Sequence, residues 1–409
     1  IHCHGAYEFD TNDANEEGLR YWAEHIVSEG VTSFLATTIT QSVEVLTNAV
    51  ANVARVMEGG YDGAEILGIH FEGPYLDMKY KGAQPEQFIA KPSVEQFKHY
   101  QEAAHGHIRY VTLATEQDDN FELTRYLTSQ GIVVSIGHSA ATYEQAVMAY
   151  ANGARSMTHV YNGMTPFNHR ANGLVGAAYR IRTMYGEIIC DGCHSTPAAL
   201  NNYFMSKGPD YSIMISDALM AKGTPVGSKY IFGGNEIVIY PDGSAHLTST
   251  GGLAGSTLNI NKGLRILVEE AMVPFNYALN ACTINPARCL HLDDRKGSIQ
   301  IGKDADLVAL ESNYDLHMLR SGPYPYYLRA RIESVRGHLS NDECSAKLLE
   351  LIQSGCKKFA LCHLSQENNT PSLALQTVFT TLGAAGVVPE KDCIVQAQRR
   401  NEVSPALEF

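Results

Sequence analysis

Residues 66–74 read Ile66-Leu67-Gly68-Ile69-His70-Phe71-Glu72-Gly73-Pro74. An apolar run that ends on ionisable side chains and a Gly-Pro turn is typical of a buried strand with chemistry at its carboxyl end. Similar runs recur along the first two-thirds of the chain, and we expect strands there too. The predicted strands cover residues 31–37, 66–71, 108–115, 132–136, 155–158, 187–190 and 211–216.

Stretches with helical periodicity lie between these strands, for example at residues 16–29, 43–57 and 143–151. Regular alternation of strands and helices indicates parallel βαβ units. With the short segment before His2 counted as a first strand, the chain has eight, which predicts a TIM-type (β/α)8 barrel of the α/β class. A doubly wound sheet gives the same alternation, but it gathers its ligands at one switch point.

Ionisable side chains follow nearly every predicted strand. Because the carboxyl ends of barrel strands meet on one face, we expect these side chains to lie close together. Some of them form a mixed set of nitrogen and oxygen ligands that suits zinc or iron, with enough ligands for one ion or two. These ligands are His2, His4, Glu72, His138 and His159. The alternative is a set of core histidines, each satisfied separately.

Asp217 closes the last predicted strand. A carboxylate beside a metal-bound water can accept its proton and pass that proton to a leaving amine. On its own, Asp217 would be better explained as the N-cap of a helix, but among these strand ends catalysis is favoured. Arg170, on a loop rich in Asn and Gly, is a candidate anion clamp, although most such arginines are merely solvated.

Composition excludes some classes of function. The chain has 409 residues and a formal charge of −13, which argues against a nucleic-acid-binding surface. No apolar run is long enough to span a membrane. Nine scattered cysteines fit a reduced, cytoplasmic setting better than a disulfide framework. A phosphorylated small molecule stays compatible with the charge, because one local Arg or Lys dominates at contact distance.

Short motifs surround the predicted ligands in a fixed order along the chain. They are His70-Phe71-Glu72-Gly73-Pro74-Tyr75, Lys81-Gly82-Ala83, Gly137-His138-Ser139, Thr158-His159-Val160-Tyr161-Asn162-Gly163-Met164, Asp191-Gly192-Cys193-His194, Ser216-Asp217-Ala218 and Leu253-Ala254-Gly255-Ser256. In this order they resemble the amidohydrolase superfamily and, within it, the N-acetylglucosamine-6-phosphate deacetylases. The resemblance covers residues 1–308.

The resemblance implies hydrolysis of the acetamide of N-acetylglucosamine 6-phosphate to glucosamine 6-phosphate and acetate. It implies that Glu72, His138 and His159 hold the principal metal ion, zinc or iron. His2 and His4 would place a second ion, and Asp217 would be the acid/base. The implied substrate contacts are Asn162, Gly163, Arg170, His194 and Leu253, with His194 also stabilising the oxyanion. Arg170 would hold the 6-phosphate across the boundary of a homodimer.

The chain departs from that family in three places. Gln84 stands where the family usually has a sugar-contacting His, so we expect that contact to be weakened or replaced. Gly163 stands where the family usually has Ala, which is a small change if the backbone N–H of this residue makes the substrate contact. Members also begin with a strand-rich segment that pairs with the region after residue 297. We therefore expect the first strand and the N-terminal part of a β-sandwich to be missing.

Another resemblance begins at residue 309. Glu311-Ser312-Asn313-Tyr314-Asp315, Gly337-His338-Leu339-Ser340-Asn341 and His363-Leu364-Ser365 are similar to the C-terminal part of metallo-β-lactamase-fold hydrolases. Such enzymes take most of their ligands from an N-terminal H-x-H-x-D-H motif, which this chain lacks. Residues 309–409 are therefore expected to be an α/β fragment without activity, with helical patterns at 342–353 and 371–382.

Two alternatives to the deacetylase stay open at this point. One is a different amidohydrolase that acts on another amide, which Gln84 keeps in consideration. The other is an inactive chimeric fusion that binds a metal or a sugar phosphate without turnover.

Overall fold

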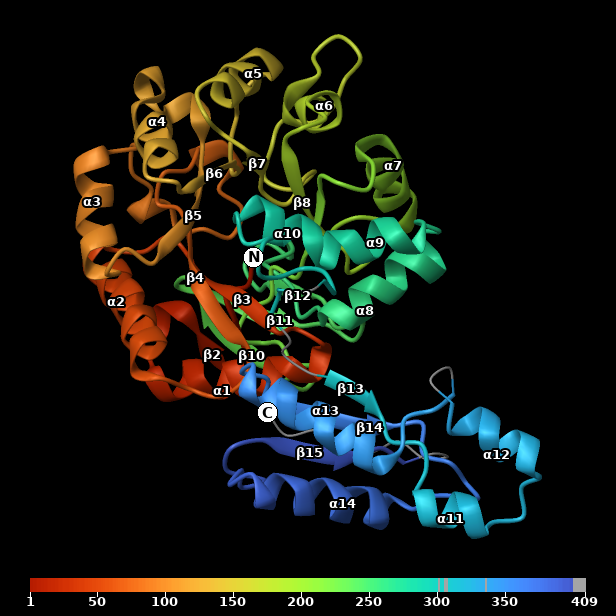
Figure 1. Ribbon diagram of the computed structural model, residues 1–409. Coiled ribbons are helices and arrows are strands. Elements are labelled where there is room, and N and C mark those ends of the chain that lie inside the picture. The colour runs from red at the N-terminus through yellow and green to blue at the C-terminus, as the bar shows by residue number, and fades with distance from the viewer. Residues whose placement is uncertain (301, 305–307, 335–336, 400–409) are drawn as a thin grey trace. The chain divides into compact units, whose positions relative to one another are not determined.

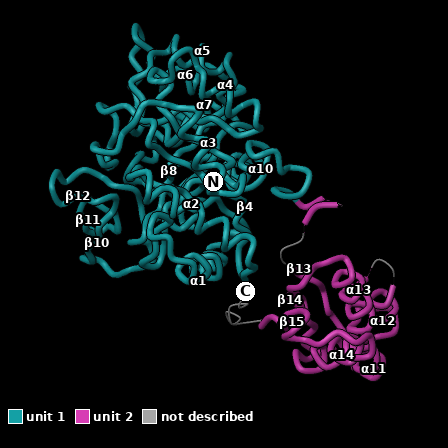
Figure 2. Tube along the Cα trace, turned by 90° about the vertical axis from the view of Figure 1, so that its left-hand side faces the viewer, with its two compact units in different colours: residues 1–298, 409 teal, residues 299–408 magenta. Residues whose placement is uncertain are grey.

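The computed structural model describes residues 1–300, 302–304, 308–334 and 337–399. The chain forms two compact units, the first comprising residues 1–298 and the second beginning at Ile299 (Figure 2). The sequence instead suggests a domain boundary between residues 308 and 309. That boundary, and the metallo-β-lactamase type of the second domain, stay predictions.

The first unit is built around a curved sheet of parallel strands (Figure 1). Their order across the sheet is also their order in the sequence: β3 (Ser33–Thr38), β4 (Glu65–Glu72), β5 (Ile108–Leu113), β6 (Val133–Ile136), β7 (Ser156–Met157), β8 (Tyr185–Ile189) and β9 (Ser212–Ile215). Each predicted strand overlaps one of these. The expected TIM-type α/β fold is confirmed, with seven of the eight strands in this sheet.

The first four residues lie between the two outermost strands of this sheet. Cys3 donates its N–H to Oγ1 of Thr37 at the end of β3 (2.8 Å) and accepts from the N–H of Thr37 (2.9 Å). On the other side, Asp217 donates its N–H to the carbonyl of His2 (3.1 Å). The segment therefore occupies the place of the predicted first strand. It continues into a short ribbon, β1 (Gly5–Ala6) and β2 (Phe9–Asp10).

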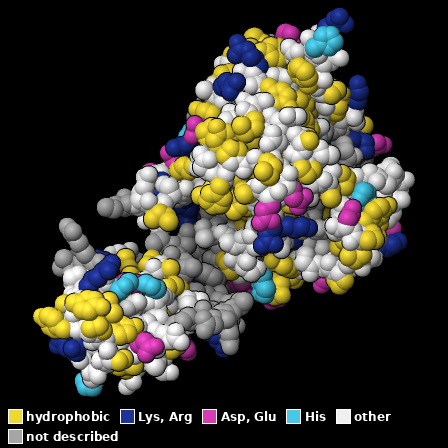
Figure 3. Space-filling model, turned by 90° about the vertical axis from the view of Figure 1, so that its right-hand side faces the viewer, with side chains coloured by type: hydrophobic (Ala, Val, Ile, Leu, Met, Phe, Trp, Pro, Cys, Tyr) yellow, Lys and Arg dark blue, Asp and Glu magenta, His cyan; other side chains and the backbone are white. Residues whose placement is uncertain are grey.

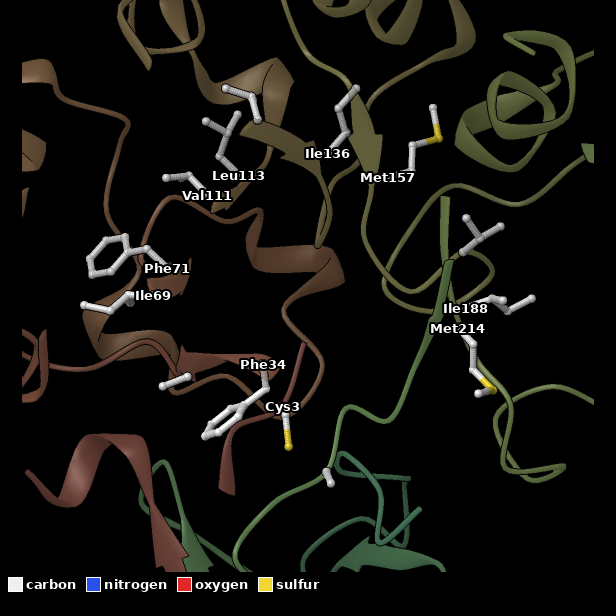
Figure 4. Packing of buried hydrophobic residues seen from close by; sticks show 14 of the residues in the cluster. Cys3, Phe34, Ile69, Phe71, Val111, Leu113, Ile136, Met157, Ile188 and Met214 are labelled. Atoms are coloured by element: carbon white, nitrogen blue, oxygen red, sulfur yellow. The ribbon is translucent and has the colours of Figure 1, made fainter. Parts of the chain in front are cut away.

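Helices cover the outer face of the strands (Figure 1). They are α1 (Glu16–Ile26), α2 (Val43–Gly59), α3 (Val94–Ala103), α4 (Glu122–Ser129), α5 (Tyr143–Ala151), α6 (Gly173–Arg180), α7 (Pro197–Lys207), α8 (Ile260–Arg265), α9 (Phe275–Cys282) and α10 (Ile284–Cys289). Figure 4 shows Phe34 of β3, Phe71 of β4, Ile136 of β6 and Ile188 of β8, whose side chains point away from the centre of the barrel. These apolar side chains pack with Trp22 and other helix residues in one core. The apolar positions that recur along the sequence are therefore those at which strands and helices contact each other.

The inward positions of the same strands alternate with the outward ones and are often polar. Nε2 of His70 lies 2.7 Å from Oγ1 of Thr112, which lies 2.7 Å from Oγ1 of Thr158. Ser135 extends this row with a further contact of 2.7 Å to Thr158. All of these side chains are fully buried, and hydrogen bonds between strands satisfy them. The row connects neighbouring strands near their carboxyl ends through side-chain hydrogen bonds.

A small antiparallel sheet follows β9, outside the predicted strands. Its strands are β10 (Lys229–Phe232), β11 (Asn235–Ile239) and β12 (Ala245–Leu247). Phe232 pairs with Asn235, so that Gly233 and Gly234 form a two-residue turn with φ of +59° and +90°. A Gly-Gly pair between strands is a recognised hairpin signal because both turn residues need positive φ. The sequence therefore contained a signal for this element.

The second unit has a parallel sheet of its own, in the order β13 (Val308–Glu311), β14 (Lys358–Cys362), β15 (Ile394–Ala397). Its helices are α11 (Leu316–Ser321), α12 (Tyr326–Ile332), α13 (Asn341–Gln353) and α14 (Pro371–Ala384). The last two contain the predicted helical stretches. Leu348, Phe359 and Val378 form part of a separate hydrophobic cluster.

Acidic and basic side chains are interspersed over the face of the molecule that Figure 3 shows. Among the described residues, no helix has both the length and the apolar character that crossing a membrane requires.

Removing the second unit tests whether the first folds alone. A chain that ends after Ser298 should still unfold in one cooperative thermal transition, because each unit has its own hydrophobic cluster. We expect its midpoint to lie within about 4 °C of the full-length value, a shift that roughly 1 kcal/mol produces in a domain of this size. Calorimetry measures this, and a broad, non-cooperative transition would show that the units share a core.

Candidate functional site

Six buried side chains lie in two groups at the carboxyl ends of the barrel strands. Within each group, the atoms able to bind a metal lie within 4.8 Å of one another. The groups are His2, His4 and Asp217, and Glu72, His138 and His159. The structure thus brings the five predicted metal ligands together with the predicted acid/base.

Glu72 belongs to the second group and also contacts the first. Its Oε1 atom is 3.4 Å from Nε2 of both His138 and His159, and its Oε2 atom is 3.3 Å from Nε2 of His4. A charge-assisted N–H···O hydrogen bond is shorter, at roughly 2.7–2.9 Å. Ligands held tetrahedrally around zinc at roughly 2.0–2.1 Å lie about 3.3 Å apart. The spacing around Glu72 is therefore that of ligands around a cation.

The imidazoles of the Glu72 group present nitrogen to nitrogen. Nε2 of His138 and Nε2 of His159 are 3.1 Å apart. Nδ1 of His138 lies 2.8 Å from the carbonyl of Tyr80, and Nδ1 of His159 lies 2.9 Å from that of Asn162. A carbonyl only accepts, so each Nδ1 carries a hydrogen, and Nε2 is the ring nitrogen left to face Glu72 and to bind a cation. A cation between the two rings would have both Nε2 atoms as ligands.

The two carboxylates of the site are ionised. Burial raises the pKa of Glu72, but the neighbouring His2 and His138 outweigh it and hold that pKa well below the usual range. Burial also raises the pKa of Asp217, but His2 and His4 outweigh this effect, so that the pKa is lowered. Oε1 of Glu72 is buried and has no hydrogen-bond partner among the described residues. A buried anionic oxygen without a donor fits a divalent ion, so these residues fit zinc or iron.

The backbone at these strand ends is unusual. His138, His159 and Asp217 have φ of +46°, +31° and +51°, a region that residues other than glycine seldom occupy. Gly163 also has a positive φ, +58°, and a Cβ added there would lie 3.1 Å from Nδ1 of His138. The Ala that is usual in the resembling family would therefore be strained and crowded here.

The two groups open into a cavity of about 180 Å³. Its lining includes His4, Glu72, Gln84, His138, His159, Asn162, Gly163, His194, Asp217, Phe232 and Leu253. His2 does not line this cavity and is only 1% exposed. Four of the five residues expected to contact the substrate therefore surround the same space as the metal ligands.

Arg170 is the predicted site residue that the structure does not bring to this cavity. It is exposed, in a tight loop where the backbones of Asn168 and Ala171 bond to each other. Its own N–H donates to Oδ1 of Asn168 (2.9 Å). Within one chain, Arg170 thus lies outside the lining of the cavity.

His194 is held by the carboxylate of Asp191. Nδ1 of His194 lies 2.7 Å from Oδ2 of Asp191, whose other oxygen accepts from the backbone N–H of Cys193 and of His194 at 2.8 Å each. Burial raises the pKa of Asp191, but these hydrogen bonds outweigh burial and hold the pKa below its usual value. The pair fixes the His194 ring and leaves Nε2 as its free polar atom.

Gln84 contacts a candidate ligand. Its Nε2 donates to Oε2 of Glu72 at 2.8 Å, and its Oε1 accepts from the N–H of Thr40 at 2.8 Å. The side chain is only 3% exposed. The amide therefore orients the Glu72 carboxylate, a role that sequence comparison with the family did not suggest.

Sequence reasoning missed three residues that surround the metal-ligand groups. Glu187 and Tyr110 are fully buried, inward-facing residues of β8 and β5. Phe232 of β10 places its ring 5.4 Å from that of His4 in an edge-on arrangement. A single carboxylate within the apolar run of β8 was the available signal for Glu187. The Gly-Gly hairpin was the signal for Phe232.

A third group of potential ligands, Glu311, His338 and His363, lies in the second unit. Nδ1 of His338 and Nδ1 of His363 lie 2.8 and 2.5 Å from the same oxygen of Glu311. These are hydrogen-bond distances, shorter than the spacing of two ligands around one ion. His363 is also 65% exposed in its side chain. The geometry indicates two exposed imidazoles that share the carboxylate of Glu311.

Comparison with known proteins agrees with this arrangement. A family model described as "Amidohydrolase family" matches residues 1–355. The N-acetylglucosamine-6-phosphate deacetylase of Bacillus subtilis (strain 168) is 42% identical over 319 residues, which cover 77% of this chain and 80% of that protein. The enzyme of the same name from Lysinibacillus sphaericus is 37% identical over 317 residues, covering 78% and 81%.

A solved structure also resembles this chain. The crystal structure of N-acetylglucosamine-6-phosphate deacetylase from Pasteurella multocida matches with a TM-score of 0.69 and 31% identity, covering 75% of this chain and 79% of that one. The fold, the matching family model and the identity to these relatives agree. This chain belongs to the amidohydrolase family.

Proposed function

We propose that this chain hydrolyses the acetamide of N-acetylglucosamine 6-phosphate, which yields acetate and glucosamine 6-phosphate. The observation that carries the proposal is the position of Asp217 beside the paired histidines and Glu72, with His194 lining the same cavity. A base, a cation centre and a polar group for the carbonyl oxygen are what amide hydrolysis requires. The names of the relatives supply the substrate.

The residues that would hold the metal are those of the two groups. Glu72, His138 and His159 would bind the principal ion, and His2, His4 and Asp217 would bind a second one. When bound, zinc or iron supplies a Lewis acid that polarises the amide carbonyl and makes water more acidic. The histidine tautomers set by Tyr80 and Asn162 keep Nε2 available for this purpose.

Asp217 moves the proton in this proposal. Its lowered pKa keeps it ionised near neutral pH, so it accepts the proton of the attacking water. The water oxygen forms the new bond to the carbonyl carbon. Asp217 then passes the proton to the amide nitrogen as the C–N bond breaks, and the amine leaves. In its protonated form, the His194 ring that Asp191 holds donates from Nε2 to the developing oxyanion.

Asn162, Gly163 and Leu253 would hold the sugar, since all three line the cavity. Arg170 would bind the 6-phosphate from a second copy of the chain. Arg170 is exposed and lies outside the lining of its own cavity, which leaves it accessible to the site of a second copy in a homodimer.

We also propose a cytoplasmic location. All nine cysteines are free thiols in the structure, although several are buried. A protein without disulfides fits a reducing compartment.

Metal content is the first test of the proposed site. Protein purified without chelators should contain about one to two transition-metal ions per chain. His138→Ala or His159→Ala should remove the principal ion and reduce acetate release to background, because each deletes a ligand beside Glu72. Elemental analysis and an acetate assay measure both effects. A metal-free, active protein would end the proposal.

The role of Asp217 is tested by Asp217→Asn. The amide keeps the shape of the side chain but cannot accept a proton from water. We expect kcat to fall by about 10²–10⁴-fold, the contribution of a general base, while the principal ion stays bound. Near-normal turnover would reassign the base, and the half-buried Glu116 would be the next candidate.

Arg170→Ala tests the phosphate contact. A lost charge-assisted hydrogen bond of roughly 1.5–3 kcal/mol should raise KM for N-acetylglucosamine 6-phosphate by about 10–100-fold. KM for unphosphorylated N-acetylglucosamine should change little. Arg125→Ala is a matched control, since Arg125 is an exposed arginine that contacts Asn152. Equal effects of Arg170→Ala on the two substrates would show that Arg170 does not bind the phosphate.

A further inference from the structure

Glu187 is a buried carboxylate that the proposed mechanism does not use. It lies on β8, is fully buried, and its Oε2 atom is 2.8 Å from Nδ1 of His2. The hydroxyl of Tyr110, on β5, donates to its other oxygen, Oε1. Both oxygens of Glu187 are therefore occupied, one by a candidate metal ligand and one by a fixed phenol.

A carboxylate deep in the barrel is costly to bury without partners. Both of its hydrogen bonds connect it to the interior of the barrel, beneath the cavity that a substrate would enter. Burial raises the pKa of Tyr110, and the neighbouring Glu187 charge raises it further, so the phenol keeps its proton and donates it. The arrangement indicates a fixed row of hydrogen bonds from Tyr110 through Glu187 to His2.

The contacts of the other candidate histidines show what is particular about His2. Nδ1 of His138 and Nδ1 of His159 each lie against a backbone carbonyl, which is a neutral acceptor. Nδ1 of His4 has no hydrogen-bond partner among the residues that the structure describes. His2 alone of these four has an anionic acceptor there. The group of His2, His4 and Asp217 therefore depends on Glu187 for the orientation of one ring.

We propose that Glu187, held by Tyr110, is a positioning residue that fixes His2 as a metal ligand and thereby sets the affinity for a second ion. This inference rests on the metal-dependent function proposed above. A carboxylate acceptor keeps the hydrogen of His2 on Nδ1 and leaves the lone pair on Nε2. That atom lies 3.5 Å from Oε1 of Glu72 and 3.4 Å from Oδ1 of Asp217. The negative charge also makes the ring a stronger donor to a cation.

The inference predicts a graded loss of the second ion. The wild-type chain should load about two zinc ions. Glu187→Met, which removes the acceptor at similar volume, should leave one, held by the Glu72 group. Glu187→Gln keeps an oxygen acceptor but no charge, and we expect the second ion to bind about 10–100-fold more weakly, as is typical when a partner of a ligating histidine is changed. Tyr110→Phe should shift the affinity in the same direction, but less.

The measurement is a zinc titration of metal-free full-length protein against a chelating indicator, with elemental analysis of the loaded protein. Glu116→Gln is the matched control. Glu116 is a half-buried carboxylate that accepts hydrogen bonds from Ser139 and from the N–H of Ala140. It should load like the wild type. Thermal unfolding of the metal-free variants checks that each one is folded, and Glu187→Gln replaces Glu187→Met if the latter is not.

Two results would overturn the inference. One is a Glu187 variant that binds the second ion as tightly as the wild type, and the other is a wild-type chain that loads only one ion. Failure of the proposed function has a different signature. The wild type would then load metal, and the Glu187 variants would change its stoichiometry, but the loaded protein would release no acetate from N-acetylglucosamine 6-phosphate.

Discussion

The buried carboxylate of Glu72 is the interaction on which the rest of the candidate site depends. A carboxylate inside a protein is tolerated only when nearby groups compensate its charge. Here the Nε2 atoms of four imidazoles lie 3.3–3.5 Å from its oxygens, and the Gln84 amide holds one of these oxygens from the side. The histidines come from three separate strand ends, so this one anion specifies where those ends must meet.

The barrel makes that meeting possible through the twofold alternation of its strands. Outward positions such as Phe71 pack against helices, while inward positions such as His70 and Glu72 face the centre. Below them, Thr112, Ser135 and Thr158 bond to one another, so their hydroxyl groups need no hydrogen-bond partner among the candidate ligands. The inward positions can therefore carry the candidate metal ligands, while the outward residues of the same strands pack in the hydrophobic core.

Much of this was readable in the sequence. Each predicted strand overlaps an observed one, because apolar runs bounded by glycine and polar residues reflect burial directly. The six residues of the two groups were readable for the same reason, since parallel strands place their carboxyl ends together.

What the sequence left out depended on contacts between distant segments. His2, the partner of Glu187, is 185 positions away along the chain. The residues around Glu187 in the sequence therefore do not indicate that its carboxylate faces a histidine. The sequence predicts only that the sugar contact at Gln84 is weakened or replaced, whereas the structure shows this side chain bonded to Glu72 and to the backbone of Thr40. Arg170 illustrates the converse limit. From the sequence, an arginine on a loop is a candidate phosphate ligand. In the structure of one chain, Arg170 is exposed and lies outside the lining of the cavity.

The backbone at the candidate site is strained in three residues. His138, His159 and Asp217 adopt left-handed conformations, each of which costs roughly 1–3 kcal/mol in a residue other than glycine. Such conformations persist only where the surrounding structure determines them. The carbonyls of Tyr80 and Asn162 hold two of these residues by their rings, and the N–H of Asp217 is held by His2. The strained residues are also the ones that turn from a strand into the cavity. A relaxed backbone would carry their side chains along the strand, and the shared position around Glu72 would be lost.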